Sequence, residues 1–284
     1  MSRVAYVSGR YRPQREAAVH IEDRGYQFGD GVYEVVAVTR GRLVDEERHL
    51  ARLHRSLTEL RINPPMSDAA LKVVMREVIH RNGVETGIVY LQVTRGVAPR
   101  DHAFPKAAKP VLVVTSRRSR PPDPRLGRDG IAVITIPDIR WQRCDIKSVA
   151  LVANVLGKQQ AREAGAYEAW QIDREGQVTE GTSTNAWIVT ADDTVITRVA
   201  DHAILNGVTR AAILDIIQRE GYRLVERPFT VAEAKTAREA FLTSTTADLL
   251  PVVRIDGASV DDGKPGPLSR KLREAYLLHA AAAA

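Results

Sequence analysis

One lysine lies where a free amine could do chemistry. Lys147 stands in the segment RCDIKSVALVANVL, between an expected strand and the apolar start of an expected helix. Such a lysine is often partly desolvated, which lowers its pKa and leaves the amine available to form an imine. The spacing equally allows a lysine whose ammonium group reaches solvent. The alternative amine, Lys158, has glutamine and arginine neighbours and is expected on a solvated helix face.

Several other residues could bind a ring nitrogen and a phosphate. Glu180 ends the expected strand QVTE, and a carboxylate there could keep a pyridine nitrogen protonated, so that the ring accepts electrons. Val208 and Thr209 precede an expected helix over 210–220, where backbone N–H groups and a hydroxyl suit a phosphate. The hydroxyl cluster with Ser244 and Thr245 in FLTSTTAD could add contacts. Each of these residues also has an ordinary structural explanation: Glu180 as an acidic residue in a turn, Thr209 as a helix cap, and Ser244 and Thr245 as polar residues at the end of a strand.

Three further side chains could hold anions. Arg52 lies about 120° from the centre of a leucine stripe on its expected helix, so its guanidinium reaches the rim of that helix. Arg100 and His102 are two residues apart in an extended loop, so both side chains point the same way and could grip a carboxylate. Each could also be a solvated polar residue. These candidate residues, which lie far apart in the sequence, would form one site only around a phosphorylated cofactor that carries an aldehyde group.

The elements that must position these residues mix strands and helices. In the first half YVSGRYRP, GVYEVVAV, IVYLQVTRG and KPVLVVTS read as strands, with helices over 45–62 and over SDAALKVVMREVIHRN, the second capped by Ser67 and ended by Gly83. In the second half a strand IAVITI precedes a helix over 149–164, two hairpins and a helix that ends at Gly221. The order lacks the rhythm of a doubly wound sheet, so we expect α+β architecture in both halves.

A segment rich in proline, arginine and glycine divides the chain. SRRSRPPDPRLGRDG, residues 116 to 130, has no apolar pattern and is typical of a linker. We therefore expect a small N-terminal α+β domain over 1–116, a linker over 117–128 and a C-terminal domain over 129–284.

Composition excludes several classes of protein. The 284 residues are 44% hydrophobic and 27% charged, as in a globular protein. No apolar run could cross a bilayer and the first residues do not resemble a secretory signal, so we expect a cytoplasmic protein without membrane contacts. A single cysteine allows no intrachain disulfide or thiolate cluster, and we expect no metal. The net charge of +6 comes from scattered arginines, so nucleic acid is not an expected partner. The sequence contains neither the phosphate loop of nucleotide hydrolases, nor the HExxH motif of zinc proteases, nor the GxSxG motif of α/β-hydrolases, so these three classes are excluded.

Seven motifs together resemble the D-amino acid aminotransferases: GDGVYEVV, EERHLARL, RGVAPRDHAFP, CDIKS, VTEGTSTN, GVTR and FLTSTTAD. These enzymes belong to the pyridoxal-phosphate enzymes of fold type IV, with branched-chain aminotransferases and aminodeoxychorismate lyase. EGxSxN, G-[IV]-T-R and the upstream lysine are typical of the fold type, and RGxxxRxHxFP of the D-amino acid branch. Valine at 208 and the threonines of EGTSTN depart slightly from the usual pattern without removing a hydroxyl or backbone donor.

The resemblance implies a two-domain fold with a smaller N-terminal α/β sandwich and a larger C-terminal pseudo-barrel. It implies that pyridoxal 5'-phosphate is the cofactor and forms a Schiff base with Lys147. Lys147 is also expected to transfer the substrate proton during the reaction, and Glu180 to pair with the pyridine nitrogen of the cofactor. Two further groups of residues follow from it: Arg52, Val208, Thr209, Ser244 and Thr245 for the phosphate, and Tyr33, Arg100 and His102 for the substrate carboxylate. Arg100 and His102 are expected from the partner subunit of a homodimer.

The activity that the resemblance implies is a ping-pong transfer of an amino group between a D-amino acid of the D-alanine type and a 2-oxo acid of the 2-oxoglutarate type. Branched-chain L-amino acid and (R)-amine transaminases of the same fold are alternatives, but both should lack the RxH pair. Aminodeoxychorismate lyase and a non-catalytic anion-binding protein are further alternatives.

Overall fold

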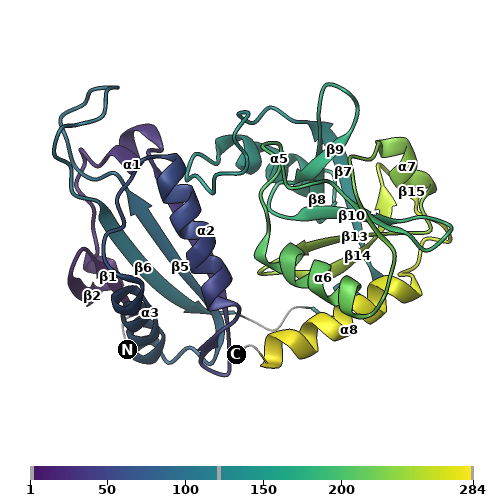
Figure 1. Cartoon of the computed structure of the whole chain (residues 1–284), viewed down its shortest axis with the longest axis horizontal. Coiled ribbons are helices and arrows are strands. Elements are labelled where there is room, and N and C mark those ends of the chain that lie inside the picture. Colours follow the sequence, from purple (N-terminus) through teal and green to yellow (C-terminus); the bar gives the residue numbers. More distant parts are fainter. Residues whose placement is uncertain (1–2, 120–122, 283–284) are drawn as a thin grey trace. The chain divides into compact units, whose positions relative to one another are not determined.

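The computed structural model describes residues 3–119 and 123–282, so residues 120–122 of the expected linker lie outside it. Contacts divide the described chain into two units (Figure 1). Unit 1 takes in the residues up to 119 together with 146–150 and the last residues from 280. Unit 2 takes in 123–145 and 151–279. The expected division kept 129–284 continuous, whereas contacts assign 146–150 to unit 1.

Unit 1 is built on an antiparallel sheet of six strands, in the order β2-β1-β6-β5-β3-β4. The strands are β1 Val4–Val7, β2 Arg10–Pro13, β3 Gly31–Thr39, β4 Arg42–Leu43, β5 Thr86–Thr94 and β6 Val111–Arg118. β3 alternates as expected, with Val32, Glu34 and Val36 buried on one face and Tyr33 on the other. Tyr33 lies opposite Gln92 of β5 on that second face.

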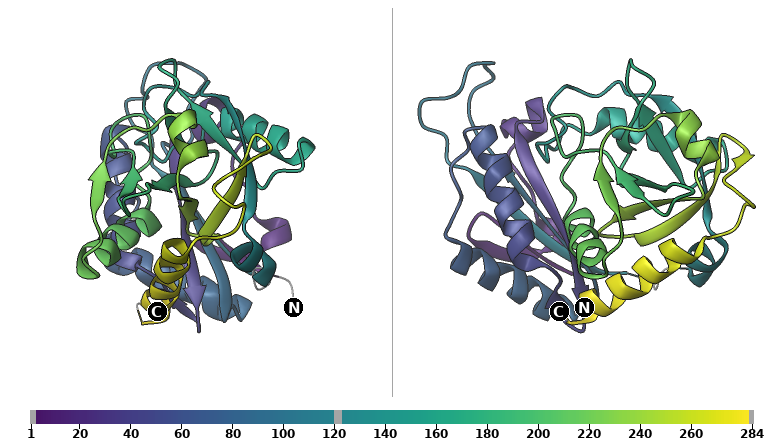
Figure 2. Two further views of the ribbon diagram at one scale, coloured as in Figure 1. Left: turned by 90° about the vertical axis from the view of Figure 1, so that its right-hand side faces the viewer. Right: turned by 45° about the vertical axis from the view of Figure 1, so that its right-hand side comes forward.

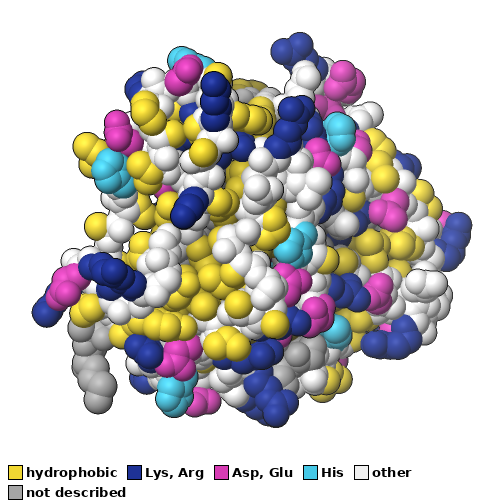
Figure 3. Space-filling view, turned by 60° about the vertical axis from the view of Figure 1, so that its left-hand side comes forward, with side chains coloured by type: hydrophobic (Ala, Val, Ile, Leu, Met, Phe, Trp, Pro, Cys, Tyr) yellow, Lys and Arg dark blue, Asp and Glu magenta, His cyan; other side chains and the backbone are white. Residues whose placement is uncertain are grey.

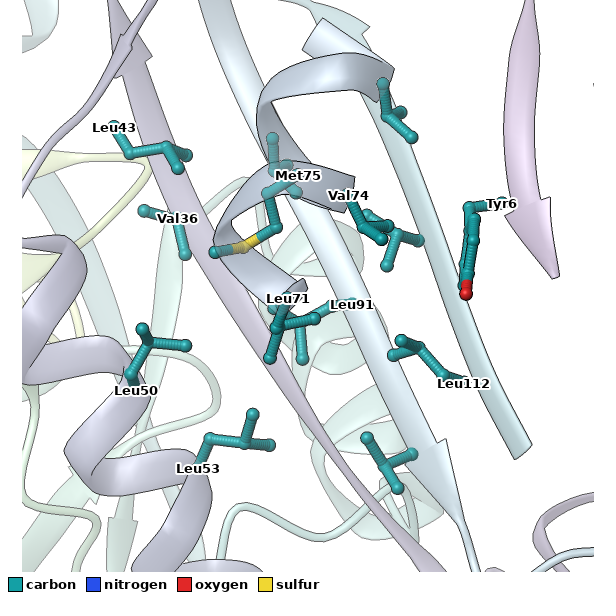
Figure 4. Packing of buried hydrophobic residues seen from close by; sticks show 14 of the residues in the cluster. Tyr6, Val36, Leu43, Leu50, Leu53, Leu71, Val74, Met75, Leu91 and Leu112 are labelled. Atoms are coloured by element: carbon teal, nitrogen blue, oxygen red, sulfur yellow. The ribbon is translucent and has the colours of Figure 1, made fainter. Parts of the chain in front are cut away.

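Two helices cover the buried face of this sheet. They are α2 Glu46–Glu59 and α3 Asp68–Asn82, beside the short helices η1 Gln14–Glu16 and α1 Arg24–Phe28. Leu50 and Leu53 of α2 and Leu71 of α3 pack against the strands (Figure 4). Ser67 caps α3 by accepting a hydrogen bond from Ala70 N, and the left-handed Gly83 ends it. Both predicted helices are thus confirmed.

Unit 2 has a mixed sheet of nine strands, in the order β12-β11-β10-β13-β14-β7-β8-β9 with β15 on β14. Its elements are α4 Pro124–Asp129, β7 Ile131–Pro137, α5 Val152–Glu163, β8 Glu168–Ile172, β9 Val178–Gly181, β10 Asn185–Val189, β11 Val195–Thr197, α6 Val208–Arg219, β12 Leu224–Glu226, α7 Val231–Thr236, β13 Glu239–Ser244, β14 Asp248–Ile255 and β15 Ala258–Ser259, together with α8 Pro267–Ala282 as far as residue 279. Both predicted hairpins are confirmed. The short helix α4 falls within the expected linker, because the Asp123 side chain caps a helix that starts with Pro124.

The sheet of unit 2 curls back on itself. β9 is its last strand, yet the short turn 182–184 leads from β9 directly into β10, and Gly181 N bonds to Thr184 O at 2.7 Å. The strands from β10 to β9 therefore form a partial barrel, seen from two sides in Figure 2. Its core includes Trp187 stacked on Phe241 with ring centroids 5.3 Å apart. The α+β fold with a pseudo-barrel is confirmed.

Basic and acidic side chains are interspersed on the face shown in Figure 3. Within the described ranges, no helix combines the length and the apolar character that a bilayer crossing needs.

Candidate functional site

Lys147 lies in unit 1, beside β3. Tyr33 N donates to Lys147 O at 3.0 Å, and Lys147 N donates to Ser56 Oγ at 3.2 Å. These bonds place the half-buried Lys147 side chain over the ring of Tyr33, with Nζ 4.4 Å from the ring centroid. The structure therefore brings two of the predicted site residues together. The Tyr33 ring in turn stacks on Tyr90 at 5.7 Å, and burial raises the pKa of Tyr90 to about 12, with a smaller contribution from Tyr33.

The alternative lysine has a structural role in unit 2. Lys158 Nζ donates to Tyr167 O at 2.6 Å and lies 3.5 Å from the fully buried carboxylate of Glu168. The expectation of a solvated face is wrong here, since this side chain is only 32% exposed. Because its amine is engaged in these bonds, Lys158 is the weaker candidate for an imine.

Arg52 is bound to a carboxylate that the sequence did not single out. Its Nε and Nη2 donate to Glu34 Oε1 and Oε2 at 2.7 and 2.8 Å, and His49 Nδ1 lies 2.7 Å from Oε2. Burial raises the pKa of the Glu34 carboxyl, but the charge and hydrogen bonds of Arg52 and the bond to His49 outweigh it, so the pKa falls to about 2. Burial lowers the pKa of His49 despite its bond to Glu34. Arg52 is thus held in a fixed orientation.

The signal for Glu34 was present in the sequence. Glu34 is a charged residue on the side of β3 that otherwise carries Val32, Val36 and Val38 toward the core. A charge on the buried side of a strand needs a partner nearby. Arg52, on the helix that covers this face, supplies it.

Arg100 and His102 share one aromatic neighbour in unit 1. Both are exposed in the loop between β5 and β6. The guanidinium carbon of Arg100 lies 4.6 Å from the ring centroid of Phe28, and the ring of His102 lies 5.4 Å from it. The two donors are therefore gathered at one place, where an anionic group could meet both.

Glu180 is the centre of a polar cluster in unit 2. This buried carboxylate accepts hydrogen bonds from Arg140 Nη1, from Asn185 Nδ2 at 3.1 Å and from Leu205 N at 3.1 Å. Arg140 also pairs with Asp138 at 2.7 Å. Burial lowers the pKa of Arg140, but the charges of Glu180 and Asp138 outweigh it and raise the pKa. Sequence reasoning missed Arg140, because an arginine outside every motif gives no signal.

The start of α6 offers backbone donors. The helix begins at Val208 after an extended Gly207, and no side chain caps it, so the expectation that Val208 and Thr209 precede the helix is wrong. Thr209 lies in the first turn, where its Oγ1 is 3.3 Å from Tyr276 Oη. The first N–H groups of a helix have no partner within it and attract anions.

The hydroxyl groups of the FLTSTTAD motif lie at the turn between β13 and β14. Ser244 ends β13 and its Oγ accepts a hydrogen bond from Ala247 N at 3.1 Å, while Thr245 lies in the turn itself. Together, uncapped helix N–H groups, hydroxyls and a buried carboxylate are the donor and acceptor types that a phosphorylated pyridine requires. The residues of unit 2 thus fit such a cofactor chemically.

Comparisons with known proteins agree with this chemistry. A family model described as amino-transferase class IV matches residues 31–255. A D-alanine aminotransferase of Bacillus licheniformis is 42% identical over 268 residues, or 94% of each chain. One of Staphylococcus haemolyticus is 41% identical over 272 residues, or 95% of each chain. A solved branched-chain amino acid aminotransferase of T.th. with pyridoxamine 5'-phosphate has a TM-score of 0.90 and 25% identity, covering 99% of this chain and 95% of that one.

Proposed function

The chain belongs to the class IV amino-transferases, and we propose that it moves an amino group between a D-amino acid of the D-alanine type and a 2-oxo acid of the 2-oxoglutarate type. Pyridoxal phosphate is the cofactor of this transamination. The choice of D-amino acids rests on one observation, the gathering of Arg100 and His102 around Phe28 in the loop RGVAPRDHAFP. The names of the relatives support the same substrate class.

The cofactor-binding residues are part of the proposal. Lys147 would form the Schiff base and Glu180 would hold the pyridine nitrogen. The phosphate would be bound by the remaining five residues, Arg52, Val208, Thr209, Ser244 and Thr245. When bound, the cofactor supplies an aldehyde and a ring that draws electrons from the carbon attached to the amino group. Asn185 supports Glu180 in this role, because it bonds to Glu180 Oε2 and to Leu205 O at 2.9 Å.

The chain's own residues would control the proton and the handedness. The amine of Lys147 would take the proton from Cα of the donor, hold it on Nζ and deliver it to the aldehyde carbon of the cofactor. The Tyr33 ring, 4.4 Å from Nζ, limits where that amine can point. Tyr33, Arg100 and His102 would grip the substrate carboxylate. With the carboxylate fixed, only one enantiomer can direct its Cα–H bond at Lys147.

We also propose a homodimer, in which the partner subunit provides Arg100 and His102, and a cytoplasmic location. Exposed apolar side chains support the homodimer. Val152, Val155 and Leu156 are 75%, 63% and 52% exposed at helical spacing on one face of α5. Size-exclusion chromatography with light scattering gives the molar mass in solution and so tests the dimer. Cell fractionation tests the location. A monomer with full activity would contradict the shared site.

An absorption spectrum tests the proposed reaction. The protein with pyridoxal phosphate should show a yellow band that bleaches on addition of D-alanine, with release of pyruvate. Lys147→Ala should lose the band and the activity, while Lys158→Ala should keep both. Faster pyruvate release from L-alanine would overturn the D-specific assignment. Release of pyruvate and 4-aminobenzoate from aminodeoxychorismate would point instead to the lyase.

A further inference from the structure

We propose that Arg24, Asp30 and Arg95 form a clamp that fixes the loop carrying Arg100 and His102, and that these three positioning residues thereby set the affinity for the substrate carboxylate. This inference rests on the proposed function, because it concerns the same substrate group. All the residues involved lie in unit 1.

Asp30 is the centre of the clamp. It lies between α1 and β3, and its Oδ2 accepts hydrogen bonds from Arg24 Nε at 2.8 Å and Arg95 Nε at 2.7 Å. Arg95 Nη2 also bonds to Asp30 Oδ1 at 3.0 Å. The side chains of Arg24, Asp30 and Arg95 are only 4%, 12% and 8% exposed. Burial raises the pKa of Asp30, but the bonds from Arg95 and Arg24 outweigh it and lower the pKa, so Asp30 stays charged.

Arg24 connects this centre to the backbone of the loop. Its Nη1 donates to Asp101 O at 2.5 Å and to Ala103 O at 3.3 Å, and Nη2 lies 3.4 Å from His102 O. The three carbonyl groups are consecutive and surround His102. One rigid guanidinium thus fixes both the carboxylate of Asp30 and the backbone on each side of His102.

Arg95 and Phe28 complete the attachment. The guanidinium of Arg95 lies 3.7 Å from the ring centroid of Phe104 in the loop. Its Nη1 and Nη2 also donate to the backbone carbonyls of residues 61 and 60, just after α2, at 3.0 and 2.7 Å. The Phe28 ring contacts Arg24 at 4.7 Å and Arg100 at 4.6 Å. Arg100 is therefore placed by a ring that the clamp itself contacts.

Two physical consequences follow for the substrate. The loop between Thr94 of β5 and Val111 of β6 has 16 residues (111 − 94 − 1), a length that usually leaves many conformations open. Fixing it beforehand removes an ordering cost from substrate binding. The three clamp side chains together also carry a net charge of +1, which partly offsets the negative charges of Asp23 and Asp101 near the place where a carboxylate would bind. The clamp should therefore affect substrate affinity more than the chemical step.

Arg24→Lys tests the proposal, because lysine keeps the charge but lacks the three nitrogens by which Arg24 contacts Asp30 and the loop carbonyls together. Arg81→Lys is the matched control. Arg81 also combines an ion pair, with Glu77, and a ring contact, with Tyr11 at 4.2 Å, and neither partner belongs to the loop. Phe104→Leu is a second variant; its side chain is 55% exposed, so the change removes the Arg95 contact without disturbing the core.

Hydrogen exchange on the cofactor-free protein is the first measurement. The hydrogen-bonded loop amides of Ala98 and Ala103, which donate to Glu22 O at 3.3 Å and Asp101 Oδ1 at 3.2 Å, should exchange at least about tenfold faster in Arg24→Lys, less so in Phe104→Leu, and at the normal rate in Arg81→Lys. The second measurement is kinetic. In Arg24→Lys the KM for D-alanine should rise about tenfold or more, with the single-turnover rate at saturation and the cofactor dissociation constant within about threefold of normal.

Two results would overturn the clamp. One is unchanged exchange and KM in Arg24→Lys. The other is a parallel loss of turnover, cofactor affinity and KM, which would indicate general structural damage. If the unmutated protein does not convert D-alanine, the proposed function fails, but the exchange experiment still decides whether the clamp holds the loop.

Discussion

The buried carboxylate of Glu34 provides a direct test of how unit 1 orients Arg52. We predict that Glu34→Gln lowers the free energy of unfolding of unit 1 by about 3 kcal/mol at pH 7. Glu34 is 1% exposed and is bonded to both Arg52 and His49. Glutamine has nearly the same shape without the charge, so the variant keeps the packing and loses the ionic part of these bonds.

The magnitude follows from the pKa. The neighbours of Glu34 lower its pKa from 4.5 to about 2. Each pKa unit corresponds to about 1.4 kcal/mol, so the folded unit prefers the ionised over the neutral side chain by about 3 kcal/mol. Because the folded pKa is the lower one, this contribution is present above pH 4.5 and is lost as the pH falls toward 2. Glutamine imitates the neutral form at every pH.

Hydrogen exchange of the amides in β3 and α2 is the suitable assay, since all three tryptophans, at 141, 170 and 187, lie in unit 2 and would not report on unit 1. The variant should exchange roughly 10²-fold faster at pH 7, and the gap should close between pH 4.5 and 2. Glu77→Gln, at a partly exposed ion pair of α3, is the control and should change the rate by less than about threefold. Rates in Glu34→Gln within about threefold of normal would refute the reasoning.

Three further predictions concern unit 2. Burial raises the pKa of the Cys144 thiol to about 12, so at pH 8 iodoacetamide should modify the folded protein at least about 10²-fold more slowly than the protein in urea, as followed by mass spectrometry. A Cβ on Gly207 would lie 2.1 Å from Asn185 Oδ1, so Gly207→Ala should weaken cofactor binding about tenfold in a spectroscopic titration; unchanged affinity would contradict this. Glu180→Gln should slow single-turnover transamination by about 10²-fold, whereas the exposed Glu175→Gln should not; equal rates would remove Glu180 from the site.

Local sequence patterns predicted most of the helices and strands, but they could not predict which strands distant in the sequence pair with each other. The leucines at 50, 53 and 57 predicted α2 because helical spacing is a local property. By contrast, β7 pairs with β14, more than a hundred residues later in the chain, and nothing in either strand specifies that choice. The motif resemblance, rather than periodicity, predicted the pseudo-barrel. The helix α4 was missed although Asp123 and Pro124 form a recognisable helix start.

The residues of the candidate site also fall into those that the sequence could identify and those that it could not. Motifs identified the residues expected to touch cofactor and substrate, such as Lys147 and Arg100. Of the residues that hold these side chains in place, Asp30 and Arg140 resemble surface charges until the fold buries them, and only Glu34, on the apolar side of β3, left a signal in the sequence. Asp30 also pairs with Arg95 and Arg140 with Glu180, 65 and 40 residues away, and no spacing in the sequence connects these partners.

Buried arginines leave local charges of opposite sign at two clusters, one in each unit. The chain has 33 arginines and eight lysines, and a planar guanidinium holds two groups in a fixed relative orientation, which the single nitrogen of an ammonium does not. In unit 1 Arg24 and Arg95 share the single carboxylate of Asp30, which leaves positive charge beside the loop expected to grip a substrate carboxylate. In unit 2 Arg140 alone faces both Asp138 and Glu180, which leaves negative charge where a protonated ring nitrogen is expected. Each local balance therefore favours the charge of the group proposed to bind there.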